Sequence, residues 1–202
     1  MAAKPVGRLP DPPSDLNSRR LPLKRVEGSL FRIHRTRLDC LFFGTNRSER
    51  FDDPLGQYGV FYAALQPEAA FAEVFLRHLS AMLVPESSIQ ERSLSEVLAD
   101  GLHCVDLSAA GLRRVSCDNR VATEMPYVVV GKWSRAFFEH PQRPDGIIYR
   151  SRHNPQFKCV ALFDHCHSKL KLKTSEPLMT GVRRPWTIKQ IARYALAIEP
   201  EP

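Results

Sequence analysis

The chain has 202 residues, of which 43% are hydrophobic and 9% aromatic, a composition that supports a hydrophobic core and excludes wholesale disorder. Its formal net charge is +7, and its longest uncharged, mostly apolar run covers residues 125–131, far short of the roughly 20 residues that a membrane-spanning helix needs. We therefore predict one soluble domain without membrane association.

The cysteines and the N-terminus bear on the cellular compartment. The five cysteines are spread along the chain without a CxxC pair, and the N-terminus lacks the basic, apolar and small-residue pattern of a secretory signal. Both features predict a cytoplasmic protein with reduced thiols. Residues 164–167 offer metal-ligand side chains, but neighbours on a strand point to opposite faces, so we expect no metal site.

The first half of the chain contains the elements on which the functional argument rests. Residues 1–25 carry five prolines and few apolar side chains, which predicts an extended, partly disordered lead-in. Residues 29–36 alternate polar and apolar side chains and predict a strand, and the turn residues of 41–54 predict a loop. A second strand is predicted over 58–65, followed by an amphipathic helix over 67–84.

Glu73 lies off the apolar stripe of this predicted helix. The stripe runs along one face from Phe71 to Met82, whereas Glu73 shares its face with Ala69 and Ala70. Because these alanines are small, they allow a ligand or another backbone to come close. Glu73 is therefore a candidate for a functional carboxylate.

The second half of the chain mixes short strands and helices. In chain order we predict a helix over 93–99, a strand over 102–107, a helix over 126–140, core strands over 146–151 and 157–164, an edge strand over 170–172 and a helix over 187–197. The elements follow no regular βαβ rhythm. This favours an α+β fold with a mainly antiparallel, split or sandwiched β-sheet and flanking helices, formed as a single domain by residues 26–202.

The C-terminal region is basic. Between residues 164 and 193 only two residues are acidic and seven are basic, namely Lys169, Lys171, Lys173, Arg183, Arg184, Lys189 and Arg193. Clustered cations favour anionic partners, and TIKQIARYALA resembles the start of a helix-turn-helix. That motif needs a second, recognition helix, and charged runs are usually solvated surface. We therefore predict a basic terminal helix packed on the domain, with nucleic-acid binding as the alternative.

Four stretches of the sequence together resemble one known family, whereas the GxGxxG, P-loop and HExxH motifs are absent. The stretches are LFRIHR with Arg32, NRSERFDDP with Arg50, GVFYAALQPEAAFAE with Tyr62 and Glu73, and YRSRHNPQFKCVALF with Ser151. In this order they resemble the RES domain, which is named for its arginine, glutamate and serine. That family occurs in toxins of bacterial toxin-antitoxin pairs and is related to ADP-ribosyltransferases. The resemblance covers residues 29 to about 172.

The sequence departs from the family pattern at two positions. Glu49 stands where the family usually has a glycine before its second arginine, and Ile33 stands where some members have a tyrosine. Because of the first departure, either Arg47 or Arg50 can be the functional arginine of this loop.

The resemblance implies an enzyme that acts on NAD without a metal. The forked guanidinium groups of Arg32 and Arg50 suit the pyrophosphate. Cleavage of the nicotinamide-ribose bond passes through an oxocarbenium-like state, whose positive charge the carboxylate of Glu73 would stabilise.

The same resemblance implies further contacts to NAD. Tyr62 would flank the nicotinamide ring, and the hydroxyl of Ser151 would hydrogen-bond the ribose. His34 shares a strand face with Arg32 and is an additional candidate for the pocket.

The expected function is therefore that of a toxin that depletes NAD by hydrolysis or phosphorolysis and so arrests growth. The family's usual partner is an antitoxin that has a helix-turn-helix DNA-binding part and covers the active site. Two alternatives stay open: transfer of ADP-ribose to a specific protein target, and a non-catalytic basic module that binds nucleic acid or another partner.

Overall fold

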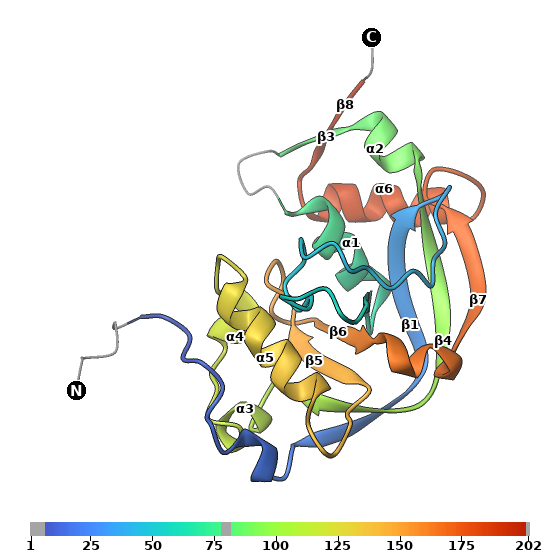
Figure 1. Ribbon diagram of the computed structural model, residues 1–202. Coiled ribbons are helices and arrows are strands. Elements are labelled where there is room, and N and C mark those ends of the chain that lie inside the picture. The colour runs from blue at the N-terminus through green and yellow to red at the C-terminus, as the bar shows by residue number, and fades with distance from the viewer. Residues whose placement is uncertain (1–6, 78–81, 201–202) are drawn as a thin grey trace.

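The computed structural model describes residues 7–77 and 82–200, which fold around one six-stranded sheet (Figure 1). Its strands are, in chain order, β1 (Leu23–Arg35), β2 (Val60–Ala64), β4 (Arg92–Asp106), β5 (Gly146–Arg150), β6 (Lys158–Phe163) and β7 (Leu170–Pro177). The spatial order is β1-β2-β6-β5-β4-β7, and β1 also pairs with β4, so that five strands close into a ring and β7 continues its edge. Within this sheet only β4 and β5 pair in parallel. The predicted α+β, mainly antiparallel fold is confirmed.

The two longest strands of this ring, β1 and β4, pair with each other. They pair along their whole length, from Leu23 opposite Val105 to Arg35 opposite Arg92. A bulge beside Gly28, which has a φ of 90°, and the turn of β4 at Gly101, with a φ of 60°, bend the pair. Because β4 bends, its first half pairs with β7 and its second half with β5.

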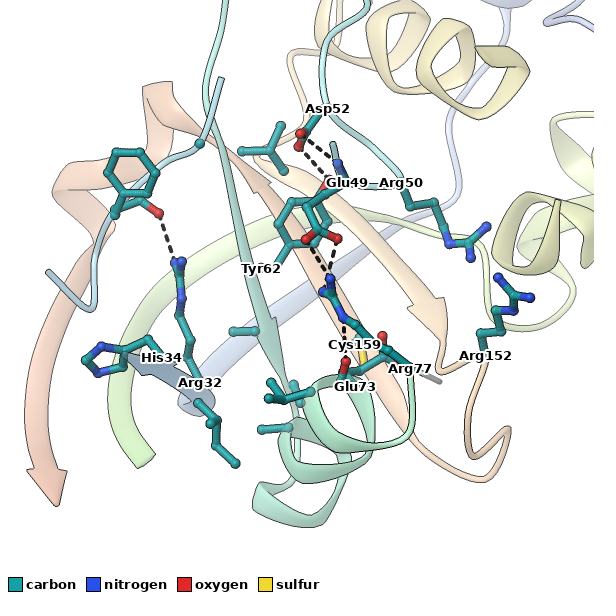
Figure 2. A pocket seen from close by; sticks show the side chains of 18 of the residues that line it. Arg32, His34, Glu49, Arg50, Asp52, Tyr62, Glu73, Arg77, Arg152 and Cys159 are labelled. Carbon is teal, nitrogen blue, oxygen red and sulfur yellow. Dashed lines mark hydrogen bonds and ion pairs between the residues drawn. The ribbon is translucent and has the colours of Figure 1, made fainter. Parts of the chain in front are cut away.

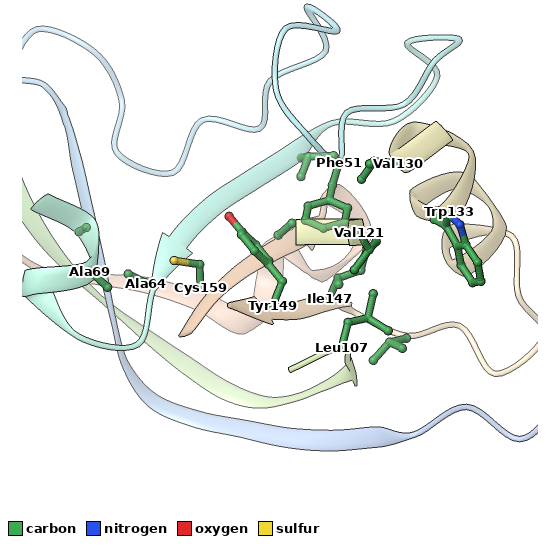
Figure 3. Close-up of a cluster of buried hydrophobic side chains, with 14 of the residues drawn as sticks. Phe51, Ala64, Ala69, Leu107, Val121, Val130, Trp133, Ile147, Tyr149 and Cys159 are labelled. Atoms are coloured by element: carbon green, nitrogen blue, oxygen red, sulfur yellow. The ribbon is translucent and has the colours of Figure 1, made fainter. Parts of the chain in front are cut away.

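Two apolar clusters lie on opposite faces of the strands. The inner cluster takes residues from all six strands, including Leu30, Phe61 and Val160, and fills the ring. The outer cluster, part of which Figure 3 shows, packs the other face of the strands against the helices. Its largest fully buried side chain is Trp133, whose indole Nε1 also donates a hydrogen bond to the carbonyl of Pro10 at 2.8 Å.

The helices gather in two groups (Figure 1). The first group contains α3 (Gly111–Arg114), α4 (Arg120–Thr123) and α5 (Val128–Phe138). The second contains α1 (Pro67–Phe75), α2 (Glu86–Gln90) and α6 (Arg183–Arg193). Short 3₁₀ helices lie at Leu16–Ser18 and Asp164–Lys169, and β3 (Leu83–Pro85) pairs in parallel with β8 (Ala197–Glu199). No helix in the described parts of the chain is long and apolar enough to cross a membrane.

The predicted helix over residues 93–99 is wrong, because these residues form the first half of β4. Leu94, Val97 and Leu98 are spaced as on a helix, but a bulge between Glu96 and Val97 interrupts the alternation expected of a strand. The continuous ladder to β1 supplies the hydrogen bonds of this segment. Tertiary pairing thus overrides the local pattern.

The other predicted helices are shorter or shifted. The helix predicted over 67–84 ends at Phe75, and residues 83–85 form β3 instead; its residues 78–81 lie outside the described part. The helices predicted over 126–140 and 187–197 extend over residues 128–138 and 183–193. The second of these helices cannot continue to residue 197, because Ala195 has a φ of 51°, which is outside the helical range.

The N-terminal segment packs on the domain. The sequence predicts a partly disordered lead-in over residues 1–25, of which 1–6 lie outside the described residues. Leu9, Leu16 and Leu21 are buried in the outer cluster, and β1 begins at Leu23. Residues 7–22 therefore complete the core instead of preceding it.

Candidate active site

A cavity of about 720 Å³ opens where β1 and β2 diverge (Figure 2). These strands pair only at Phe31 and Ala64, so they separate beyond that point and both line the cavity. The loop before β2, helix α1 and the loops around Met125 and Arg152 complete the wall. Five of the seven predicted site residues line it, namely Arg32, His34, Arg50, Tyr62 and Glu73, whereas Arg47 and Ser151 do not.

Glu73 projects from α1 into this cavity. The helix begins with Pro67 at its first turn, and Ala69, Ala70 and Ala72 are buried against the sheet, which brings the helix backbone close to the strands. The Oε1 atom of Glu73 is buried and has no hydrogen-bond partner among the described residues. A buried acceptor left unpaired costs about 1–3 kcal/mol, and more when it is charged. An orphan carboxylate oxygen at a cavity wall is the feature expected of a ligand-binding group.

Several titratable groups face Glu73 from other elements. They are Arg50 and Glu49 on the loop, Arg77 after α1, Tyr149 on β5, His153 on the following turn and Cys159 on β6. Burial raises the pKa of Tyr149 and of Cys159 well above their ordinary values. Both groups are therefore neutral at pH 7.

Arg50 is 8% exposed and has no carboxylate partner among the described residues. Its Nη1 donates to the carbonyl of Glu124 at 3.0 Å, and its guanidinium lies 4.7 Å from the ring centre of Tyr127. Burial lowers the pKa of Arg50, but a guanidinium stays charged in proteins. The side chain thus presents an uncompensated positive charge that is held in place.

Arg32 supplies a second such charge on the opposite side of Tyr62 (Figure 2). Its Nη1 donates to the carbonyl of Phe42 at 2.9 Å, and the guanidinium lies 4.8 Å from the ring centre of Phe61. His34, two residues on, has both ring nitrogens in contact with protein oxygens, at 2.9 Å from the carbonyl of Arg35 and 2.8 Å from the Oγ of Ser95. Burial lowers the pKa of His34, which keeps its ring neutral at pH 7.

Tyr62 uses its hydroxyl to hold the loop that carries Arg50. The hydroxyl donates to Oδ1 of Asp52 at 2.9 Å and accepts the backbone N–H of Phe51 at 2.8 Å. Asp52 in turn accepts the N–H of Glu49 at 2.9 Å, and Phe51 is fully buried. Because the hydroxyl is occupied by these contacts, the ring is the part of Tyr62 that remains for a ligand.

Ser151 lies behind the cavity wall and is 2% exposed. Its Oγ accepts the backbone N–H groups of His153 and Asn154 at 3.2 and 3.0 Å, which closes the turn after β5. Arg152 and His153, on this turn, do line the cavity. This placement favours a positioning role for Ser151 over direct contact with a ligand.

The structure distinguishes the two arginines of the loop. Arg47 is exposed, has a φ of 60°, and donates from Nη2 to the carbonyl of Leu55 at 3.2 Å, outside the cavity. Arg50, three residues later, faces inward because the buried Phe51 and the bonds of Asp52 fix the loop beside it. Arg50 is therefore the arginine of this loop that a bound ligand meets.

Sequence reasoning did not single out several lining residues. They are Glu49, Asp52, Arg77, Tyr127, Tyr149, Arg152 and His153. Arg152 and His153 directly follow Ser151, and Asp52 stands two residues after Arg50. Their position within the family motifs is the signal that could have identified them. Arg77 had no such signal, because its side chain pairs with Glu49, which lies 28 residues earlier in the chain.

The protein matches a known family over most of its length. The family model described as RES domain matches residues 29–187, which include all seven candidate site residues. The chain belongs to the RES domain family. The chain is also 36% identical over 94 residues to the probable toxin y4kH of Sinorhizobium fredii, a match that covers 46% of this chain and 73% of the relative.

The RES domain described here has a solved structural relative. A chain in the crystal structure of the M. tuberculosis MbcT-MbcA toxin-antitoxin complex matches it with a TM-score of 0.68, covering 89% of this chain and 98% of that one. At 15% identity this likeness supports the fold alone. Within the described residues, no group of three or more His, Cys, Asp or Glu side chains is placed to hold a metal ion.

Proposed function

We propose that this RES domain is the toxin of a toxin-antitoxin pair and that it cleaves the nicotinamide-ribose bond of NAD. The observation that carries the proposal is the buried Oε1 of Glu73, which has no hydrogen-bond partner in the described part of the chain and lies on the wall of a cavity that also holds Arg32 and Arg50. The cavity volume of about 720 Å³ is in the range of roughly 300–1,000 Å³ in which small-molecule sites fall. The family membership and the toxin names of the relatives support the toxin role.

The residues of the cavity suit the steps of this reaction. Arg32 and Arg50 carry charges that no carboxylate neutralises among the described residues, and a pyrophosphate would pair with them. As the bond to nicotinamide breaks, positive charge develops on the ribose, where the carboxylate of Glu73 would stabilise it. Nicotinamide leaves as a neutral molecule, so the reaction needs no strong acid, and the ring of Tyr62 offers it an aromatic wall.

Release of nicotinamide from NAD by the purified protein tests the proposal. We expect release that yields ADP-ribose when water is the acceptor and a phosphorylated ADP-ribose when inorganic phosphate is, so parallel assays with and without phosphate identify the acceptor. If neither buffer gives release, labelled NAD in a host lysate tests transfer to a protein. Absence of both release and labelling would contradict the proposal and favour the non-catalytic module, whose binding to nucleic acid would weaken steeply with salt.

The partner we propose is an antitoxin that has a helix-turn-helix part and covers the cavity, in the cytoplasm. Three apolar side chains that line the cavity, Leu38, Phe42 and Met125, are more than half exposed, a position that a protein partner would cover. Expression of the toxin alone should arrest growth, and affinity capture from the native host should recover a small DNA-binding protein. Growth without arrest, or capture without such a partner, would contradict this part of the proposal.

A further inference from the structure

The spacing of Glu73 and Arg77 favours an ion pair that the structure does not form. On a helix, an acidic residue four positions before a basic one brings the two side chains together, and this order is the favourable one. Arg77 stands four positions after Glu73, just beyond the end of α1 at Phe75. Nevertheless no ion pair joins Arg77 to the carboxylate of Glu73 in the described part of the chain, and Oε1 of Glu73 stays unpaired.

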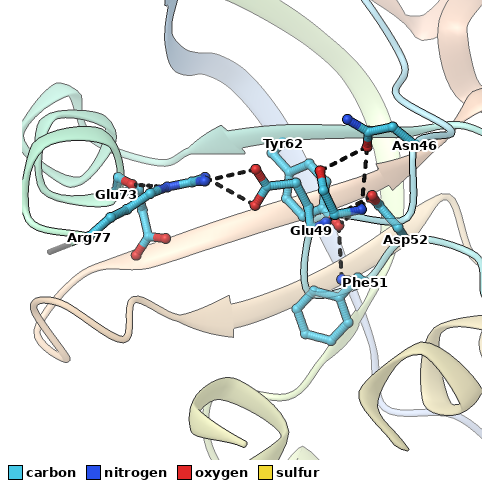
Figure 4. A network of polar contacts seen from close by, with 8 residues as sticks. Asn46, Glu49, Phe51, Asp52, Tyr62, Glu73 and Arg77 are labelled. Atoms are coloured by element: carbon cyan, nitrogen blue, oxygen red, sulfur yellow. Dashed lines mark hydrogen bonds and ion pairs between the residues drawn. The ribbon is translucent and has the colours of Figure 1, made fainter. Parts of the chain in front are cut away.

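Arg77 is instead engaged by Glu49 (Figure 4). Its Nη1 and Nη2 donate to the two carboxylate oxygens of Glu49 at 2.8 and 3.0 Å, and its Nε donates to the backbone carbonyl of Glu73 at 2.9 Å. A two-pronged contact of this kind is the strongest arrangement for a guanidinium and a carboxylate. Each of the three guanidinium nitrogens thus has an acceptor other than the carboxylate of Glu73.

Glu49 is well placed to keep this contact. Its backbone N–H donates to Oδ2 of Asp52 at 2.9 Å, and Oδ1 of Asp52 accepts the hydroxyl of Tyr62 at 2.9 Å. The carboxylate that competes for Arg77 is therefore tied through the loop to β2, on the side of the cavity across from α1 (Figure 4). Both partners keep some exposure, 49% for the side chain of Arg77 and 33% for that of Glu49, so the pair can rearrange when one member is removed.

We propose that Glu49 is a positioning residue that holds Arg77 off the carboxylate of Glu73 and so leaves Oε1 of Glu73 available to the substrate. The inference rests on the proposed function. Without Glu49, Arg77 would turn to the carboxylate of Glu73, the other acidic side chain whose charge acts on it. A paired Glu73 would be a poorer stabiliser of developing positive charge, and the guanidinium beside it would repel that charge.

Three variants test this role through the rate of NAD cleavage. Glu49→Ala should lower kcat by about ten- to hundredfold with a smaller change in KM. The reason is that NAD can still bind, whereas the Glu73 carboxylate that should stabilise the transition state is paired with Arg77. Adding Arg77→Ala should restore kcat to within about threefold of the Arg77→Ala single variant, because the competitor is gone. Glu139→Ala, which removes a half-exposed carboxylate from the ion pair with Arg135 outside the cavity, is the matched control.

The proposal is overturned if the double variant is as slow as Glu49→Ala, because the pair would then act only as a tie between the loop and the helix. It is equally overturned if Glu49→Ala retains the kcat of the control. A purely structural tie predicts that either single variant is as damaging as the double, whereas our proposal predicts that the second substitution rescues the first.

A second measurement does not depend on activity and so separates this inference from the proposed function. Crystal structures of the wild type and of Glu49→Ala show whether Arg77 changes its partner. In Glu49→Ala a guanidinium nitrogen of Arg77 should lie within hydrogen-bond distance of Oε1 of Glu73, because the competing carboxylate is gone. An Arg77 that still leaves this oxygen unpaired in Glu49→Ala would overturn the proposal even in a protein that cleaves NAD.

Discussion

Glu73→Gln is expected to lower the rate of nicotinamide release about 100- to 1,000-fold while leaving the protein at least as stable as the wild type. The rate falls because an amide keeps the shape of the side chain but not the negative charge that the oxocarbenium-like state requires. Stability does not fall, because the wild-type carboxylate has a buried oxygen that none of the described residues hydrogen-bonds, and a neutral amide is less costly to bury there. Single-turnover assays with NAD and chemical unfolding followed by circular dichroism measure the two quantities.

The matched control for this variant lies on the same helix. Glu68 is also part of α1, but it lies outside the cavity and contacts the indole Nε1 of Trp186 at 3.4 Å. Glu68→Gln should retain the wild-type rate. If both variants cleave NAD normally, Glu73 has no part in the chemistry, and if Glu73→Gln unfolds at clearly lower denaturant concentration, the carboxylate serves the fold.

Arg50→Ala is expected to reduce kcat/KM for NAD about a hundredfold, whereas Arg47→Ala should stay within about twofold of the wild type. A guanidinium that pairs with a phosphate in a partly buried site contributes a charge-assisted hydrogen bond whose loss costs about 1.5–3 kcal/mol. Because the phosphates are bound equally before and during bond cleavage, this loss should appear mainly in KM. Arg50 faces the cavity over Tyr127, and Arg47 is bonded to Leu55 outside it. Steady-state kinetics of both variants measure the difference.

Arg50→Lys refines this test. Lysine keeps the charge but has neither the planar fork nor the stacking surface that contacts Tyr127, so we expect its kcat/KM to lie between those of Arg50→Ala and the wild type. Unfolding curves are needed beside the kinetics, because the carbonyl of Glu124 loses its partner in the alanine variant. A larger defect in Arg47→Ala than in Arg50→Ala would reverse the assignment.

The strand, turn and helix around Tyr62 and Glu73 were predictable because their signals are local. Alternation over residues 58–65, the proline that opens α1 and the small residues beside Glu73 depend only on neighbours in the chain. The same holds for the type of fold, since strands and helices in irregular order already favour a mixed, mainly antiparallel sheet. Four short motifs were sufficient to indicate the RES domain family, which the match over residues 29–187 confirms.

Other features depended on contacts between segments far apart in the chain. Residues 93–99 are a strand because β1 pairs with them, and residues 83–85 are a strand instead of a helix because they pair with β8, more than 100 residues away. Residues 7–22 pack although they are rich in proline, because the outer cluster has room for their three leucines. In each case a partner that no local window contains outweighs a weak local preference.

The sequence by itself determined the family, the class of fold and five of the residues that line the cavity. Only the tertiary structure decided that Arg50 rather than Arg47 points inward, that Ser151 supports a turn, and that the guanidinium of Arg77 pairs with Glu49. The physical reason is that residue type and spacing specify which chemistry is available. The direction of a side chain, by contrast, depends on the partners that folding brings to it.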